Sequence, residues 1–158
     1  MKHRYVKAGI VVASLAALVV TDRATAQTAK MTPAEIVAER QRLMKLNGAS
    51  WADAQAKLKA GNIEAIAVNA ETMAMNAAQI SALFPEGSLT DKSHAKPEIW
   101  QKWAEFESAA KNYQAQAEKL RDAAKSKDAA ATEAVAKDFG RQACGTCHTP
   151  FRVPPPRS

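Results

Sequence analysis

The sequence predicts an all-α protein, an antiparallel four-helix bundle, and three observations support this fold class. After residue 26 the chain is rich in Ala, Lys, Glu and Gln, the residue types that favour helix. Apolar residues recur at alternating steps of three and four, as on the buried face of a helix. Prolines occur only near the ends and around one loop, so four long helices remain, joined by short turns and that loop.

The first helix is predicted to begin at Pro33. Thr32 suits the N-cap, Pro33 suits the first helical position, and Glu35 completes a capping box with Thr32. Gly48 either ends this helix or only interrupts it, because the helical pattern resumes beyond it and continues to Gly61.

The second helix is predicted to follow Gly61 and to end at Phe84, just before Pro85. Its buried stripe comprises Ile63, Ile66, Ala70, Met73, Ala77, Ile80 and Phe84. The segment that follows, up to Lys96, is polar and lacks periodicity, so it is predicted to be the longest loop.

The third and fourth helices complete the bundle. The third is predicted to start at Pro97, with a buried stripe of Ile99, Trp103, Phe106, Ala110, Tyr113, Ala117, Leu120 and Ala124. A break at 126–128 leads to the fourth, which carries Val135 and Phe139 and runs through residues 144–148 before Pro150.

The first 26 residues are typical of a cleaved secretory signal peptide. A basic start precedes an apolar run of 13 residues, Ala8 to Val20, and Ala24-Thr25-Ala26 has the small-residue spacing of a cleavage site. A membrane anchor is the alternative, but a spanning helix needs about 20 apolar residues. The sequence therefore predicts a periplasmic protein with one domain at 27–153 and a disordered, proline-rich tail at 154–158.

The amount and distribution of charge do not indicate a nucleic-acid-binding surface. The formal net charge is +6, from 22 basic and 16 acidic side chains. Cleavage would remove four basic side chains and one acidic one, leaving 18 and 15 and a net charge of +3. The remaining basic residues are dispersed along the chain rather than clustered.

The chain has only two cysteines, Cys144 and Cys147, and several kinds of site use this spacing. A thioredoxin-like redox pair would accompany a βαβ pattern, which this sequence lacks. A structural zinc site needs four ligands, whereas the domain holds two Cys and two His, with His94 distant in sequence. The pentapeptide that ends at His148 matches Cys-x-x-Cys-His, the attachment sequence of haem c.

Each residue of this motif has a chemical task. Thiols one helical turn apart can both add to the vinyl groups on one porphyrin edge as thioethers, and the adjacent imidazole can bind the iron. We therefore expect one covalent haem c, attached through Cys144 and Cys147, with His148 as the proximal iron ligand.

A haem motif at the extreme C-terminus of a four-helix chain, followed by Phe151-Arg152, resembles the cytochrome c-prime family. The similarity extends over the domain and includes Lys96 to Trp100. By analogy with the family, Arg152 would lie near the proximal face of the haem, although a solvated arginine is the alternative. The chain departs from the family at Pro150, where members usually continue their helix.

Members of the family divide into five-coordinate haems and six-coordinate haems that take a methionine from the first helix. The string Leu43-Met44-Lys45-Leu46-Asn47-Gly48 looks like the methionine-ligated members, so Met44 is the predicted distal ligand. Met44 could instead pack without ligating, and Met73 and Met75 are interpreted as packing residues. The resemblance also implies that Arg40 contacts a haem propionate, unless it is a solvated charge.

These observations lead to two main functional hypotheses. A His/Met haem would make the protein a one-electron carrier between periplasmic redox partners. A five-coordinate haem would instead bind nitric oxide or carbon monoxide. A haem enzyme would need a distal acid–base group, for which Arg40 is the only candidate on the first helix, so we expect no enzymatic activity. Family members often dimerise through the first two helices, which makes a homodimer one option here.

Overall fold

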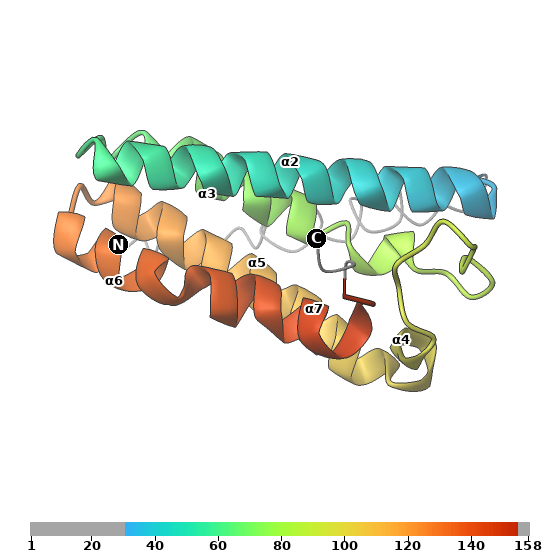
Figure 1. Cartoon of the computed structure of the whole chain (residues 1–158). Coiled ribbons are helices and arrows are strands. Elements are labelled where there is room, and N and C mark those ends of the chain that lie inside the picture. Colours follow the sequence, from blue (N-terminus) through green and yellow to red (C-terminus); the bar gives the residue numbers. More distant parts are fainter. Residues whose placement is uncertain (1–30, 155–158) are drawn as a thin grey trace, which may run out of the picture.

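The computed structural model describes residues 31–154 (Figure 1). Its helices are α2 (Pro33–Lys59), α3 (Ile66–Ala77), α4 (Glu98–Gln101), α5 (Trp103–Lys125), α6 (Ala129–Phe139) and α7 (Thr146–Phe151), with a 3-10 helix at Ser81–Leu83 and a π-helix at Gly140–Gly145. No strand occurs within residues 31–154, and the predicted all-α fold is confirmed. The predicted signal peptide 1–26 lies outside the described residues, as does most of the tail predicted at 154–158.

Four helical rods form the bundle, and they alternate in direction. α2 and α5 are the first and third rods, α3 is the second, and α6, the π-helix and α7 follow one another as the fourth (Figure 1). α3 packs against both α2 and α5, and α5 also packs against α6 and the π-helix. None of the helices between residues 31 and 154 has a stretch long and apolar enough to cross a membrane.

The first predicted helix is confirmed as one unbroken element. Thr32 caps α2, its backbone N–H donates to a Glu35 carboxylate oxygen at 2.7 Å, and the capping box is complete. Helical structure continues through Gly48, so that glycine does not end the helix. The chain turns instead at Gly61, where φ is +70° and the amides of Gly61 and Asn62 close the helix end.

The second predicted helix is shorter than expected. α3 ends at Ala77, and from there to Phe84 the backbone winds more tightly, with i→i+3 hydrogen bonds such as Ile80 N–H to Ala77 O at 3.1 Å. Ile80 and Phe84 nevertheless stay buried, at 4% and 9% exposed. The apolar stripe therefore correctly predicted that these two residues are buried, but it did not predict that they belong to a turn and to the end of a 3-10 helix rather than to an α-helix.

The prediction that Trp103 is buried with the rest of the third stripe is wrong. Lys102 has a non-helical backbone (φ −125°, ψ 45°) that separates α4 from α5, so the periodicity does not run along one helix. Trp103, the first residue of α5, is 37% exposed, whereas Phe106 is 3% exposed. Met75 also differs from expectation, because it is 63% exposed rather than packed.

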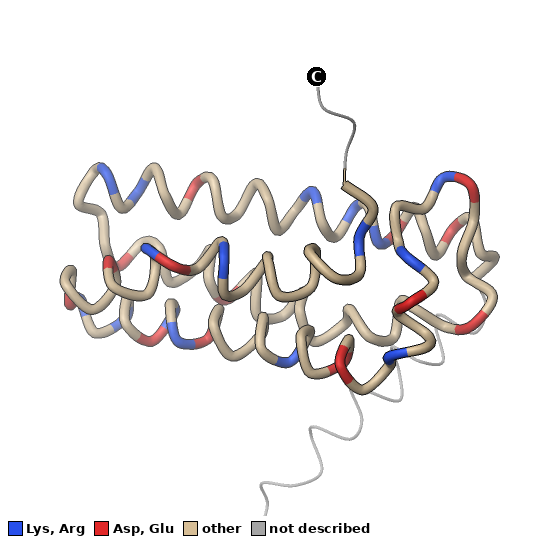
Figure 2. The backbone as a smooth tube through the Cα atoms, turned by 60° about the horizontal axis from the view of Figure 1, so that its bottom comes forward, with Lys and Arg blue, Asp and Glu red and all other residues tan. Residues whose placement is uncertain are grey.

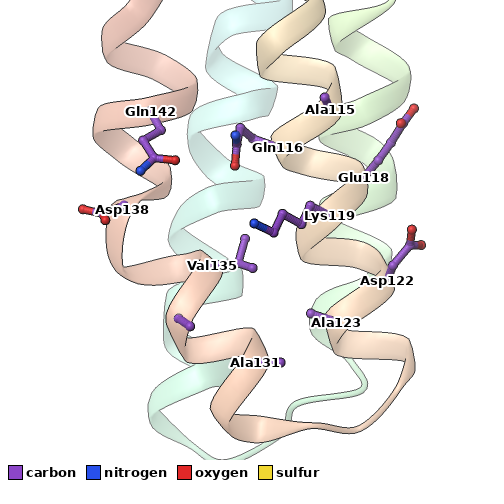
Figure 3. Close-up of a pocket in the computed structure, with 11 residues that line it drawn as sticks. Ala115, Gln116, Glu118, Lys119, Asp122, Ala123, Ala131, Val135, Asp138 and Gln142 are labelled. Carbon is purple, nitrogen blue, oxygen red and sulfur yellow. The ribbon is translucent and has the colours of Figure 1, made fainter.

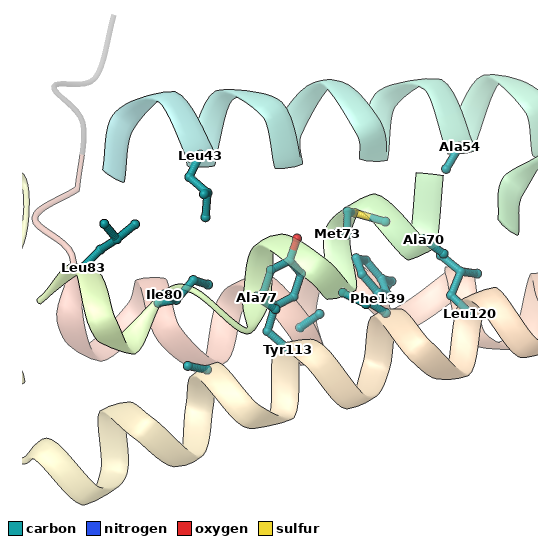
Figure 4. Close-up of a cluster of buried hydrophobic side chains, with 14 of the residues drawn as sticks. Leu43, Ala54, Ala70, Met73, Ala77, Ile80, Leu83, Tyr113, Leu120 and Phe139 are labelled. Carbon is teal, nitrogen blue, oxygen red and sulfur yellow. The ribbon is translucent and has the colours of Figure 1, made fainter. Parts of the chain in front are cut away.

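The core lies between α2, α3, α5 and α6. Figure 4 shows Leu43, Met73, Tyr113 and Phe139 gathered in its centre, each from a different helix. The Phe139 ring is 4.6 Å from Trp51 of α2 and 6.2 Å from Tyr113 of α5, centroid to centroid. Aromatic contacts thus connect the fourth rod to the first and third.

We expect Phe106→Ala to cost about 3–5 kcal/mol of unfolding free energy, because it removes a buried ring. That ring stands edge-on to Phe84 at 4.7 Å and to Phe151 at 5.5 Å. Trp103→Ala should cost less than about 1.5 kcal/mol, because Trp103 is substantially exposed. Urea denaturation of both variants checks the difference, and equal losses would contradict it.

Candidate haem-binding site

The predicted attachment motif lies where the last helical rod changes its winding. Cys144 belongs to the π-helix, and Cys147 and His148 belong to the first turn of α7. A π-segment within an α-helix is often found at a functional site. Here Asn112 of α5 stabilises it, because the Asn112 side-chain amide donates to the carbonyl of Gln142 at 2.6 Å.

The two cysteines are free thiols, and both are partly buried against the hydrophobic core. Burial raises the pKa of Cys144, and burial together with the neighbouring Cys144 raises the pKa of Cys147 to about 11. Both thiols are therefore protonated at neutral pH, and both remain available for thioether formation with a porphyrin.

His148 is held in the form that binds a metal. Burial and the positive charge of Arg152 lower the pKa of its imidazole, so the neutral, ligating form prevails at neutral pH. Arg152 is thus close enough to act electrostatically on His148, and its contact with the proximal face of the haem stays a prediction.

The end of α7 is anchored to the long loop by backbone hydrogen bonds. Lys96 N–H donates to Phe151 O at 3.0 Å, and Val153 N–H donates to His94 O at 2.8 Å. α7 includes Pro150 and continues to Phe151, so the proline does not end the helix early. The His94 side chain is exposed, and only its backbone takes part in this contact.

Arg40, the predicted propionate partner, is buried and bound to another part of the protein. Its guanidinium donates to the carbonyl oxygens of Leu83 and Ser88 and to the Ser88 hydroxyl, and it lies 3.9 Å from the centre of the Phe84 ring. Burial lowers the pKa of Arg40 to about 10. Two of its five N–H groups remain for other partners, so the propionate contact stays a prediction.

We expect Arg40→Ala to destabilise the protein by about 2–4 kcal/mol, because it leaves buried acceptors at Leu83 and Ser88 without donors. Arg42→Ala is the matched control, since Arg42 is exposed and, within residues 31–154, its one ion pair is with Glu39 on the same helix. That change should cost less than about 0.5 kcal/mol. Chemical denaturation measures both, and a small loss for Arg40→Ala would show that the loop does not depend on it.

Met44, the predicted distal ligand, is partly buried and packs against the hydrophobic core. Figure 1 shows α2 running opposite to α6 and α7, and the contact between Trp51 and Phe139 sets their relative level. Met44 lies seven residues before Trp51, which is about 10 Å along α2. Because the fourth rod runs in the opposite direction, the same level on that rod lies about 10 Å after Phe139. Met44 is therefore level with the stretch from Cys144 to His148.

Asn47, one turn after Met44, is buried in a way that the sequence does not predict. Its side chain is 7% exposed, and its Oδ1 accepts a hydrogen bond from Asn76 Nδ2 at 2.8 Å. Its own Nδ2 is buried and has no hydrogen-bond partner among the described residues. The sequence feature that could have indicated this role is a polar residue one helical turn after Met44.

A groove of about 740 Å³ between α5 and α6 is separate from this site (Figure 3). Gln116, Lys119, Val135, Asp138 and Gln142 contribute to its lining, which contains neither cysteine of the motif nor His148. Figure 2 shows acidic and basic residues interspersed along the described backbone, without an extended region of one sign. Neither the groove nor the charge distribution identifies a nucleic-acid or metabolite site.

The residues present fit a covalently bound haem. Two thiols and an imidazole stand on adjacent turns of one helical rod, so this rod can supply both the two thioether bonds and the iron ligand that haem c requires. The buried Nδ2 of Asn47 supplies an unused polar group on the same level as Met44. Tyr113 lies next to the motif. Burial and the neighbouring Cys144 raise the pKa of its phenol.

Comparisons with known proteins agree with this fit. A family model described as Cytochrome C' matches residues 35–152. Among solved structures, a cytochrome c' with an unusual ligand-controlled dimer dissociation has a TM-score of 0.72 at 25% identity. Cytochrome c' from Thermochromatium tepidum has a TM-score of 0.70 at 25% identity, and a nitric oxide complex of a mutant cytochrome c prime from Alcaligenes xylosoxidans has 0.70 at 26%. Each alignment covers 78% of this chain and 98% of the other, and a search of curated proteins finds no significant match.

Proposed function

This chain belongs to the cytochrome c' family, since the family match spans most of its length, and on that premise we propose that it is a one-electron carrier with a His148/Met44 haem. Its cofactor is the covalently attached haem c of that family. When bound, the haem supplies reversible one-electron chemistry at its iron.

The chain's own residues have separate roles in this proposal. Cys144 and Cys147 hold the porphyrin as thioethers, and His148 provides a neutral imidazole to the iron. The core that half-buries these residues excludes water from one side of the site. Exclusion of water limits solvent reorganisation when the charge of the iron changes.

The observation that carries the proposal is the level of Met44 on α2, opposite the stretch from Cys144 to His148. A thioether there would fill the sixth position, so that electron transfer would need little rearrangement of ligands. A thioether is also a soft donor that favours ferrous iron and raises the reduction potential.

A second candidate function is gas binding at a five-coordinate iron, and the comparisons favour it more than electron carriage. One similar structure is a nitric oxide complex, and another is described by its ligand-controlled dimer dissociation. In this candidate Met44 would fold aside, which its three rotatable bonds permit. We retain electron carriage as the first candidate because a single side chain decides whether the sixth position of the iron is filled. An identity of 25–26% to these structures does not determine the role of one side chain.

Optical spectra of the oxidised and reduced protein, with and without carbon monoxide, separate the two candidates. A low-spin spectrum in both states and a ferrous form that resists carbon monoxide would support the electron carrier. A high-spin ferrous form that binds carbon monoxide at once would overturn it in favour of the gas-binding protein.

The remaining proposals concern setting and assembly. We propose a periplasmic location, with redox proteins of that compartment as partners, and no enzymatic role, because Arg40 is committed to the loop at Leu83 and Ser88. A homodimer is proposed through α2 and α3, which carry the exposed apolar side chains Leu46 and Met75. Analytical ultracentrifugation tests that assembly.

A further inference from the structure

The buried amide of Asn47 needs a hydrogen-bond acceptor that the described residues do not supply. An amide N–H removed from water without a partner is costly, and such groups are rare in folded proteins. The Asn47 side chain is buried, with an exposed fraction of 7%. Its Oδ1 accepts the hydrogen bond from Asn76, whereas its Nδ2 has no partner within residues 31–154. The unused Nδ2 therefore indicates a partner that belongs to the complete haem site.

The geometry of α2 restricts where that partner lies. Side chains on a helix lean over the turn that precedes them, so Asn47 leans towards residues 43 and 44. Leu43, at 1% exposed, points into the core, as Figure 4 shows. The bond from Asn76 holds Oδ1 on the α3 side, so Nδ2, the other branch of the same amide, is available to the neighbouring turn that carries Met44.

We propose that Nδ2 of Asn47 donates a hydrogen bond to the sulfur of Met44 in the haem-bound protein. This inference rests on the proposed function, since it assumes that Met44 occupies the sixth position. Thioether sulfur is a weak acceptor, and a donor there withdraws electron density from it. The weakened sulfur stabilises ferric iron less, so Asn47 is a positioning residue that raises the reduction potential and restrains the Met44 side chain.

Two variants of the holoprotein separate this role from ordinary packing. Asn47→Ala and Asn76→Ala both remove the hydrogen bond between the two asparagines, but only the first removes Nδ2. Asn47→Ala should reduce the ferrous-to-ferric ratio at a fixed potential by about fivefold, or about 41 mV at 59 mV per tenfold for one electron. Asn76→Ala keeps Nδ2 but releases the bond that orients it, so it should change that ratio by at most about twofold, which is about 18 mV on the same conversion.

A double-mutant cycle gives a second readout that a merely structural role would not produce. In a Met44→Ala background, Asn47→Ala should no longer change the potential, because the acceptor is absent. Asn47→Leu, which keeps the branching at Cγ without an amide, replaces Asn47→Ala if the smaller residue prevents folding. The sulfur-to-iron charge-transfer band of the ferric protein should also shift in the Asn47 variants, and by less in Asn76→Ala.

The outcomes distinguish the inference from the function beneath it. If the wild-type protein is low-spin but the Asn47 and Asn76 variants change the potential equally, Asn47 only joins α2 to α3 and the inference fails alone. An Asn47 effect that persists without Met44 overturns it as well. If the wild-type spectrum is already high-spin, the inference and the electron-carrier proposal fail together.

Discussion

Replacing Met44 with alanine is expected to convert a low-spin haem protein into a high-spin one that binds carbon monoxide. Met44 is the methionine of α2 that lies level with the stretch from Cys144 to His148, and no other side chain of that turn supplies a soft donor. Loss of the thioether removes its preferential stabilisation of ferrous iron, so the reduction potential should fall by roughly 100 mV or more, an order-of-magnitude expectation for losing an axial ligand. Optical spectroscopy and redox titration measure both changes.

Met75→Ala is the matched control for that experiment, because Met75 is 63% exposed on α3. It should leave the spectrum and the potential as they are in the wild type. A Met44→Ala protein with an unchanged spectrum would identify Met44 as a packing residue. The gas-binding candidate would then replace electron carriage.

Replacing both Cys144 and Cys147 with serine should abolish nearly all covalent haem. In the proposed site each thiol forms one thioether, so a single replacement would leave one bond and the double replacement none. The wild-type protein should keep its haem through acid-acetone extraction, whereas the double variant should release whatever it binds. Absorbance of the extracted and protein-bound fractions measures the difference, which should exceed about tenfold, because only coordination and packing, which acid-acetone disrupts, would then hold the haem.

Thr146→Ser is the control for the cysteine variants, since Thr146 is exposed and stands between the two attachment sites. Its hydroxyl contacts the carbonyl of Gln142 at 3.2 Å, and serine preserves that group. This variant should retain its haem in full. Extraction of free haem from the wild-type protein would refute covalent attachment. The double-serine variant should also be less stable to heat, since bound cofactor contributes to folding free energy.

Much of the fold could be predicted because its signals are local. The capping box at Thr32 and the break before α6 follow from residues within a few positions of one another, and both occur as expected. The attachment motif is equally local, because haem attachment needs Cys144, Cys147 and His148 in one short stretch. Helix type was less predictable, since a tightened helix at Ser81–Leu83 buries the same apolar side as an α-helix would.

The sequence by itself determined the fold class and the attachment motif, because periodicity and spacing are properties of neighbouring residues. Met44 became the candidate sixth ligand only through the resemblance of residues 43–48 to methionine-ligated members of the family. Only the tertiary structure decided the environments of Arg40 and Asn47. Arg40 meets Leu83 and Ser88 more than 40 positions away in the chain, and Asn47 meets Asn76 from the next helix. Such contacts depend on how the helices pack against one another. Helical periodicity identifies which face of a helix is buried, but not which atoms of other helices contact that face.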